Sequence, residues 1–138
     1  MIQEQLSRQV IPYDKDCDRI IIAGSRSFND YKMLEKTLDE FMKTIEGSKF
    51  EFISGMAEGA DILGEKYAEE HDYPVRKFPA KWAVYGKSAG FRRNEEMVSY
   101  ASYGKGVLFA FWDGESKGTK NTIDLAVENN FVLSVIKF

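Results

Sequence analysis

The stretch Arg19-Ile20-Ile21-Ile22-Ala23-Gly24 decides the fold of this 138-residue chain. Its four central residues are all apolar, so neither face of a pleated strand would present a polar side chain to water. Uninterrupted runs of this kind are typical of strands buried on both sides of a parallel sheet, and this one ends at a glycine. The stretch therefore predicts an α/β domain with helices on both faces of its sheet.

A helix is expected after this strand. Apolar side chains recur at helical spacing from Leu34 to Ile45. Asn29 or Asp30 can cap the first turn, and Gly47 can end the helix.

The rest of the chain repeats the alternation of strand and helix. Further strands are expected at 50–54, 74–78, 106–111 and 131–136, and further helices from about 61, at 91–101 and at 119–129. Pro74 and two charged residues make 74–78 an edge strand, and the long segment 79–90 is expected to be a functional or mobile loop. This order predicts a single Rossmann-like three-layer sandwich with a mainly parallel five-stranded sheet at 19–138, after a polar N-terminal leader at 1–18.

The composition fits one globular domain. Hydrophobic residues make up 43% of the chain, which at this length supports a single core. The formal net charge of -3 disfavours a protein that binds nucleic acid along a basic surface. No run reaches the roughly 20 apolar residues of a membrane span, and the leader lacks the apolar core of a signal peptide. We therefore expect no membrane partner and a cytoplasmic location.

Metal and nucleophilic chemistry have little support in the sequence. Cys17 is the one cysteine and His71 the one histidine. A lone cysteine forms no intramolecular disulfide, which is consistent with a reducing compartment. Neither residue belongs to a visible catalytic triad or metal-ligand cluster, so we expect no metal and no cofactor.

Ligands of such folds bind beyond the carboxyl ends of the strands, so four loops converge on the expected site. The first contains Gly24, Ser25 and Arg26. A glycine lets backbone N–H groups approach an anion, the serine offers a hydroxyl, and the arginine can form a two-pronged pair with phosphate. The alternative is a packed strand end with a solvated arginine.

The second loop places Gly55 and Gly59 at a strand-to-helix junction, which suits a phosphate or a ribose. Its spacing is not the G-x-G-x-x-G of dinucleotide-binding folds. Asp61 would repel a phosphate unless it binds ribose hydroxyls or the loop backbone, and it could equally be a helix cap or a first-turn acid.

The third loop is basic and aromatic. Its triplet at 86–88 is not a P-loop, because Lys81 stands where that motif needs a glycine. An aromatic ring such as Trp82 could stack on a base, while Lys87, Arg93 and Asn94 could reach a phosphate. The alternatives are aromatic packing under a loop and an internal ion pair of Arg93 with a carboxylate.

The fourth loop combines Gly114 and Gly118 with the hydroxyls of Ser116 and Thr119 at a helix start, which again suits an anion. Residues from three of the four loops are expected to form one crevice: Ser25, Gly55, Gly59, Gly114 and Thr119.

Four ordered motifs carry a family resemblance: G-S-R at 24–26, S-G-M-A-E-G-A-D at 54–61, the segment 78–97 that begins F-P-A-K-W, and F-W-D-G-E-S-K-G-T at 111–119. In these motifs the chain resembles the YspA-related branch of the SLOG superfamily. The resemblance implies a Rossmann-like pocket for a nucleotide or nucleotide-derived ligand, and association into a homodimer.

Related LOG-type phosphoribohydrolases cleave the N-glycosidic bond of nucleoside monophosphates. Arg93 and Met97 match their R-K-x-x-M motif, with Asn94 in place of lysine. Thr122 stands where their P-G-G-x-G-T-x-x-E motif has its glutamate, so the usual carboxylate is missing. Four acids remain as candidate catalytic substitutes: Glu58, Asp61, Asp113 and Glu115.

Three functions follow from these observations. The favoured one is a sensor or sequestering module that binds a nucleotide or a nucleotide-derived small molecule. The alternative is a nucleotide-processing N-glycosidase with an altered catalytic acid. A DNA-processing domain like that of DprA, which shares the superfamily fold, is least favoured because of the acidic charge balance.

Overall fold

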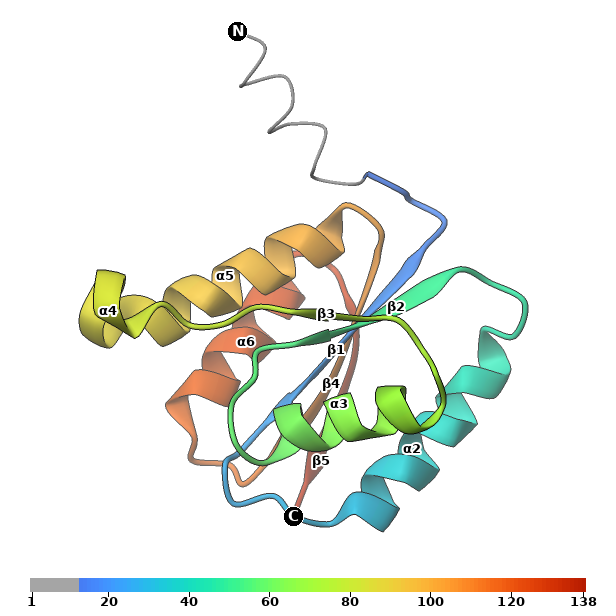
Figure 1. The fold of residues 1–138 in the computed structure, drawn as a ribbon, viewed down its shortest axis with the longest axis horizontal. Helices are drawn as coiled ribbons and strands as arrows, with labels where there is room; N and C mark the ends of the chain where they lie inside the picture. The colour runs from blue at the N-terminus through green and yellow to red at the C-terminus, as the bar shows by residue number, and fades with distance from the viewer. Residues whose placement is uncertain (1–12) are drawn as a thin grey trace, which may run out of the picture.

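One sheet of five parallel strands organises the protein, in the order β3-β2-β1-β4-β5 (Figure 1). The structure is a computed structural model that describes residues 13–138. The strands are β1 (Asp18–Gly24), β2 (Phe50–Ser54), β3 (Val75–Lys77), β4 (Lys105–Trp112) and β5 (Val132–Lys137). The helices are α2 (Tyr31–Thr44), α3 (Ala60–Glu70), α4 (Trp82–Tyr85), α5 (Ala89–Ser102) and α6 (Lys117–Glu128). The predicted α/β Rossmann-like fold is confirmed.

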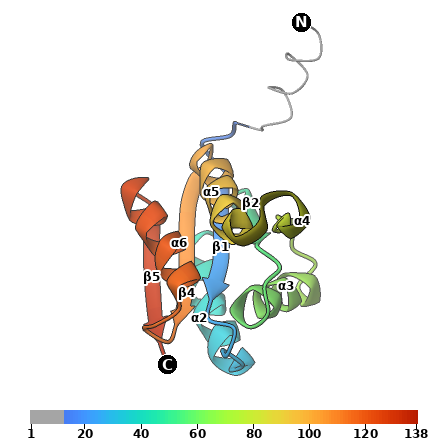
Figure 2. The same ribbon diagram turned by 90° about the vertical axis from the view of Figure 1, so that its left-hand side faces the viewer.

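Strand β1 lies at the centre and is buried on both faces. Ile20 and Ile22 belong to a core that includes side chains of α2 and α3, whereas Ile21 and Ala23 belong to a second core with α5 and α6. Because successive side chains of a strand alternate, one apolar run supplies both cores. The result is the three-layer arrangement visible in Figures 1 and 2.

The predicted boundaries of the other elements hold closely. Asp30 is the N-cap of α2, and its carboxylate accepts a hydrogen bond of 3.1 Å from the backbone N–H of Met33. The proline-led strand β3 has only three residues and lies at one edge of the sheet, as predicted. Strand β5 forms the other edge.

The expected loop 79–90 is partly helical. It contains the four-residue helix α4 and a 3₁₀ turn, η1 (Gly86–Ser88), which leads into α5. Helix α5 therefore begins at Ala89, two residues before the predicted start. None of the side chains of α4 or η1 is buried, so the apolar periodicity that marks a packed helix is absent from their sequence.

The N-terminal leader predicted at 1–18 lies mostly outside the described residues. Where the description begins, Tyr13 makes an edge-to-face ring contact with Tyr103, and β1 starts at Asp18. Within residues 13–138, no helix is both long enough and apolar enough to cross a membrane. The same part of the chain has no cluster of three metal-ligating side chains.

Candidate functional site

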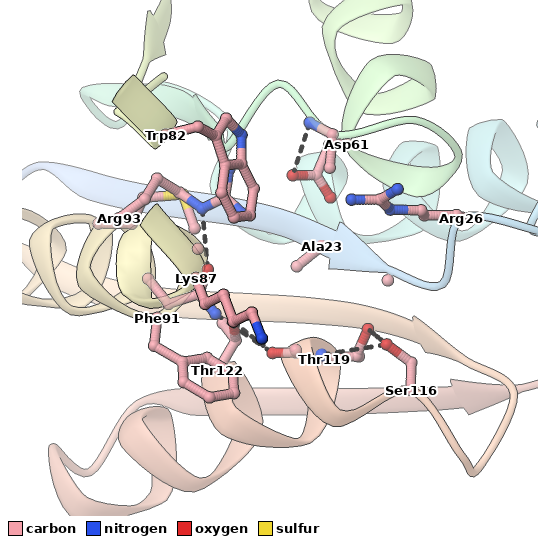
Figure 3. A pocket seen from close by; sticks show the side chains of 16 residues that line it. Ala23, Arg26, Asp61, Trp82, Lys87, Phe91, Arg93, Ser116, Thr119 and Thr122 are labelled. Atoms are coloured by element: carbon pink, nitrogen blue, oxygen red, sulfur yellow. Dashed lines mark hydrogen bonds between the residues drawn. The ribbon is translucent and has the colours of Figure 1, made fainter. Parts of the chain in front are cut away.

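A cavity of about 240 Å³ lies at the carboxyl ends of the central strands. We call it the first cavity. Its lining residues come from β1, from helices α3, α5 and α6, and from the segments before these helices (Figure 3). They are Ala23, Gly24, Arg26, Ala57, Asp61, Trp82, Lys87, Gly90, Phe91, Arg93, Asn94, Met97, Ser116, Gly118, Thr119 and Thr122.

The loop after β1 reaches the cavity through its glycine and its arginine, not through its serine. Gly24 permits the close approach of β1 to β4, since a Cβ atom there would lie 2.2 Å from the carbonyl oxygen of Phe111. Ser25 is buried, and its hydroxyl accepts a hydrogen bond of 3.0 Å from the backbone N–H of Asp113. Arg26 is exposed and lines the first cavity.

The loop after β2 is packed tightly against the loop after β1. Gly59 has a φ of +85°, and a Cβ atom there would lie 2.3 Å from the carbonyl oxygen of Ser25. Only glycine satisfies both conditions without strain. Gly59 therefore serves chain packing, and neither Gly55 nor Gly59 lines the first cavity.

Asp61 lies in the first turn of α3, where it faces both the loop and the cavity. Its carboxylate accepts a hydrogen bond of 3.4 Å from the backbone N–H of Ala57. Burial raises the pKa of Asp61 to about 7, although the nearby positive charge of Arg93 opposes this shift. Asp61 therefore holds the loop and can carry a proton near neutral pH.

Arg93 is positioned by hydrogen bonds to neutral groups. Its Nη1 donates to the carbonyl oxygen of Gly55, and its Nε donates to Oδ1 of Asn94 over 2.9 Å. Among residues 13–138, no carboxylate oxygen lies within 4.0 Å of its guanidinium nitrogens. Burial and the neighbouring charge of Arg26 lower the pKa of Arg93, and Asp61 offsets part of this effect.

The segment that joins β3 to α5 supplies the outer wall. Trp82 of α4 and Lys87 of η1 both line the cavity, together with Phe91 and Arg93 of α5. In the view of Figure 3, Trp82, Asp61 and Arg26 lie along one side, with Lys87 and Thr119 across from them. Two aromatic rings and three cations thus border one space.

The loop after β4 is fixed by Asp113, whose carboxylate accepts backbone hydrogen bonds from Glu115 and Ser116 over 2.8 and 2.9 Å. These bonds lower the pKa of Asp113. Ser116 is the N-cap of α6 and accepts a hydrogen bond from the backbone N–H of Thr119. Gly114 has a φ of +87° and does not line the first cavity.

The charges of the first cavity are unbalanced. Arg26, Lys87 and Arg93 line it, and none of them forms an ion pair within the described part of the chain. Asp61 is the one carboxyl group that lines it among residues 13–138, and its pKa is raised. First-turn residues of α3, α5 and α6 also face this space, so the positive ends of three helices favour an anion there.

The structure brings together most of the residues that the sequence singles out for ligand binding. Those that line the first cavity are Gly24, Arg26, Asp61, Trp82, Lys87, Arg93, Asn94, Ser116, Gly118 and Thr119. Of the five residues expected to form the crevice, Thr119 lines the first cavity. Gly55 lines a neighbouring hollow instead, and Ser25, Gly59 and Gly114 pack or turn the chain outside the first cavity.

The four candidate catalytic acids separate in the same way. Only Asp61 lines the first cavity, while Asp113 holds its loop and Glu115 lies outside the lining. Glu58 lines a neighbouring hollow. Thr122 does line the cavity, and its hydroxyl donates to the carbonyl oxygen of Gly118 over 3.2 Å.

Some lining residues carry no signal in the sequence. Ala23, Ala57, Gly90 and Phe91 form parts of the wall that the sequence does not single out. Small and apolar side chains give no chemical indication of a site. Phe91 is the exception, since an aromatic residue beside the basic loop could have been included with Trp82.

A parallel α/β sheet with a positively charged cavity at its strand ends defines a Rossmann-like domain with a site suited to an anionic ligand. The chain belongs to the YspA, cpYpsA-related SLOG family, whose sequence profile matches residues 18–85. The Gene 61 protein of Mycobacterium phage D29 is 33% identical over an alignment of 109 residues, and the match covers 75% of this chain and 83% of that relative.

A solved structure shares the fold at low sequence identity. The X-ray structure of DNA processing protein A (DprA) from Streptococcus pneumoniae matches 94% of this chain with a TM-score of 0.66 and 14% identity. The chain spans about half of that protein, since the match covers 52% of DprA. This likeness concerns the fold alone.

Proposed function

We propose that this protein binds a phosphorylated nucleoside, or a small molecule derived from one, in the first cavity, and that it serves as a sensor or sequestering module. Arg26, Lys87 and Arg93 carry the proposal. They are three cations without an ion-pair partner in residues 13–138, and they line one cavity of a chain with a net charge of -3. Like charges held together in this way repel one another, and an anionic ligand relieves that repulsion.

The remaining walls favour a nucleotide over a bare anion. Trp82 and Phe91 are about half exposed at the cavity, so their ring faces are available to a planar base. Ser116 and Thr119 place hydroxyl groups at the start of α6, which is a common setting for a phosphate. Membership of the SLOG family is consistent with a nucleotide-related ligand.

The first experiment is native mass spectrometry of protein purified gently from cells, followed by calorimetric titration with the nucleotide whose mass is found. A bound nucleotide-sized mass supports the proposal. Protein that carries no such mass and also fails to bind a panel of nucleoside mono- and diphosphates contradicts it.

Replacing Arg93 with lysine tests the residue that we expect to hold the phosphate. Lysine keeps the positive charge but loses the planar fork, so we expect Arg93→Lys to weaken binding of a phosphorylated ligand by about tenfold or more. Calorimetric titration measures the affinity, and thermal melting without ligand reports any loss of stability.

Arg92→Lys is the matched control. Arg92 is the neighbouring arginine, donates a hydrogen bond of 3.0 Å to Ser88, lies over the ring of Tyr85, and is absent from the lining of the first cavity. Equal affinities of Arg93→Lys and Arg92→Lys would exclude a phosphate-clamping role for Arg93.

Asp61 supports a second candidate function, an N-glycosidase. A carboxyl group with its pKa raised to about 7 can hold the proton that a general acid donates. No other carboxyl group lines the first cavity among the described residues, and Thr122 supplies none. We expect little release of base from ordinary nucleoside monophosphates. Chromatography measures the release of base. Turnover of about 1 per second that Asp61→Asn abolishes would favour the N-glycosidase function.

A further inference from the structure

A second hollow of about 370 Å³ adjoins the first cavity. It lies between the loop after β2 and the segment that follows β3, and Arg26, Gly55, Met56, Ala57, Glu58, Pro79, Ala80, Trp82 and Arg93 line it. Arg26, Ala57, Trp82 and Arg93 line both spaces. The two spaces therefore adjoin at these four residues, which form the junction between the two compartments.

The junction contains two cations close to each other. Arg26 and Arg93 both line it. Burial lowers the pKa of Arg93, the charge of Asp61 opposes this shift, and the charge of Arg26 adds to it. Within residues 13–138, neither arginine has an ion-pair partner. A diphosphate carries enough negative charge to satisfy both, and its oxygens suit the paired donors of guanidinium groups.

The second hollow has a different chemical character beyond this junction. The lining residues that it does not share with the first cavity are Gly55, the apolar residues Met56, Pro79 and Ala80, and the acidic residue Glu58. Among residues 13–138, no cation lines it besides the two that it shares. Glu58 would repel a terminal phosphate, whereas it can accept hydrogen bonds from hydroxyl groups.

We propose that the site takes a nucleoside diphosphate that carries a second, uncharged arm bearing hydroxyl groups. The diphosphate lies at the junction between Arg26 and Arg93, the nucleoside occupies the first cavity, and the second arm enters the second hollow beside Glu58. This inference rests on the proposed function and specifies its ligand.

Two matched ligand series test the inference, each with the base held constant: AMP, ADP and ADP-ribose, and UMP, UDP and UDP-glucose. ADP-ribose and UDP-glucose are the two-armed ligands. Titration should show that the two-armed ligand binds about tenfold or more tightly than the nucleoside diphosphate of the same series, in at least one of the two series. If the mono- and diphosphates bind and the second arm adds nothing, the inference is wrong while the proposed function stands. If no member of either series binds, the proposed function fails as well.

Variants of the second hollow show where the arm lies. Ala80→Trp fills the hollow and should bring the affinity ratio of two-armed ligand to nucleoside diphosphate close to one. Ala83→Trp is the matched control, because Ala83 lines neither compartment and is exposed. An unchanged ratio in Ala80→Trp would overturn the inference even if the two-armed ligand binds tightly.

A second substitution guards against misfolding of Ala80→Trp. Glu58 is exposed, so Glu58→Gln should leave the melting temperature unchanged. The amide accepts hydrogen bonds less strongly than a carboxylate, and we expect it to lower the affinity ratio by about threefold or more. A ratio equal to that of the unmodified protein would contradict the placement of the arm beside Glu58.

Discussion

Within the described part of the chain, Asp61 is the single carboxyl group that lines the first cavity, and the other charged lining residues are all basic. It is 4% exposed, and burial raises its pKa to about 7, against 3.8 for the ordinary group. In the ligand-free protein, the unfolded chain therefore loses this proton at a lower pH than the folded chain does. The contribution of Asp61 to stability is fully present below about pH 4 and is lost as the pH rises through 7.

Asp61→Asn should remove this dependence on pH. The amide can still accept the hydrogen bond from Ala57, and it carries no charge that burial penalises. We expect the free energy of unfolding of the variant, minus that of the unmodified protein, to rise between about pH 4 and pH 8 by at most about 4 kcal/mol. Urea denaturation across this range measures the difference. If the free energies of unfolding of the two proteins change with pH in parallel, Asp61 ionises normally in the folded protein.

The same residue shows what could be inferred of the site from sequence. Two of the uses suggested for Asp61, contact with the loop backbone and a place in the first helical turn, are present together in the structure. Arg93 and Trp82 were also singled out from the sequence, and both line the first cavity. The sequence left aromatic packing for Trp82 and an internal ion pair for Arg93 as open alternatives. Ser25 was misleading, since a hydroxyl in such a loop can bind either a ligand or the neighbouring loop.

At the scale of elements, the N-terminus of helix α2 tests which residue caps a helix. Both Asn29 and Asp30 are suitable N-cap residues, and the structure has Asp30 as the cap. Asp30→Ala should lower the free energy of unfolding by about 1 kcal/mol, because one backbone N–H of the first turn loses its acceptor. Asn29→Ala, its exposed neighbour, should change it by less than about 0.5 kcal/mol. Thermal and urea denaturation measure both changes. If Asp30→Ala and Asn29→Ala lower the free energy of unfolding equally, Asp30 is not the N-cap.

The elements that sequence reasoning identified are those that bury apolar side chains. Strands β1 and β4 have long apolar runs, and their parallel pairing follows from the alternation with helices. Helix α4 was not identifiable, because its four residues are all exposed and contribute to a cavity wall instead of a core. The second hollow was hidden for a related reason, since Met56, Pro79 and Ala80 have no distinctive chemistry.

At the scale of the whole molecule, the question is whether the basic cavity belongs to a small-molecule site or to a nucleic-acid surface. The fold is shared with DprA, a DNA processing protein, at 14% identity. The chain as a whole has 19 basic and 22 acidic residues. A surface that follows a strand of DNA needs several cations in a row along the backbone, whereas a compact ligand needs a few around one cavity.

Binding of single-stranded DNA should therefore be weak. Three cations at the first cavity have no ion-pair partner among residues 13–138, so few counterions are released when a polyanion binds there. We expect a dissociation constant above about 100 μM for a 30-nucleotide oligomer at roughly 150 mM salt. Fluorescence anisotropy across a range of salt concentrations measures both the affinity and its salt dependence. Micromolar binding whose affinity falls steeply with salt, and which survives Arg93→Lys, would indicate an extended nucleic-acid surface instead of a small-molecule site.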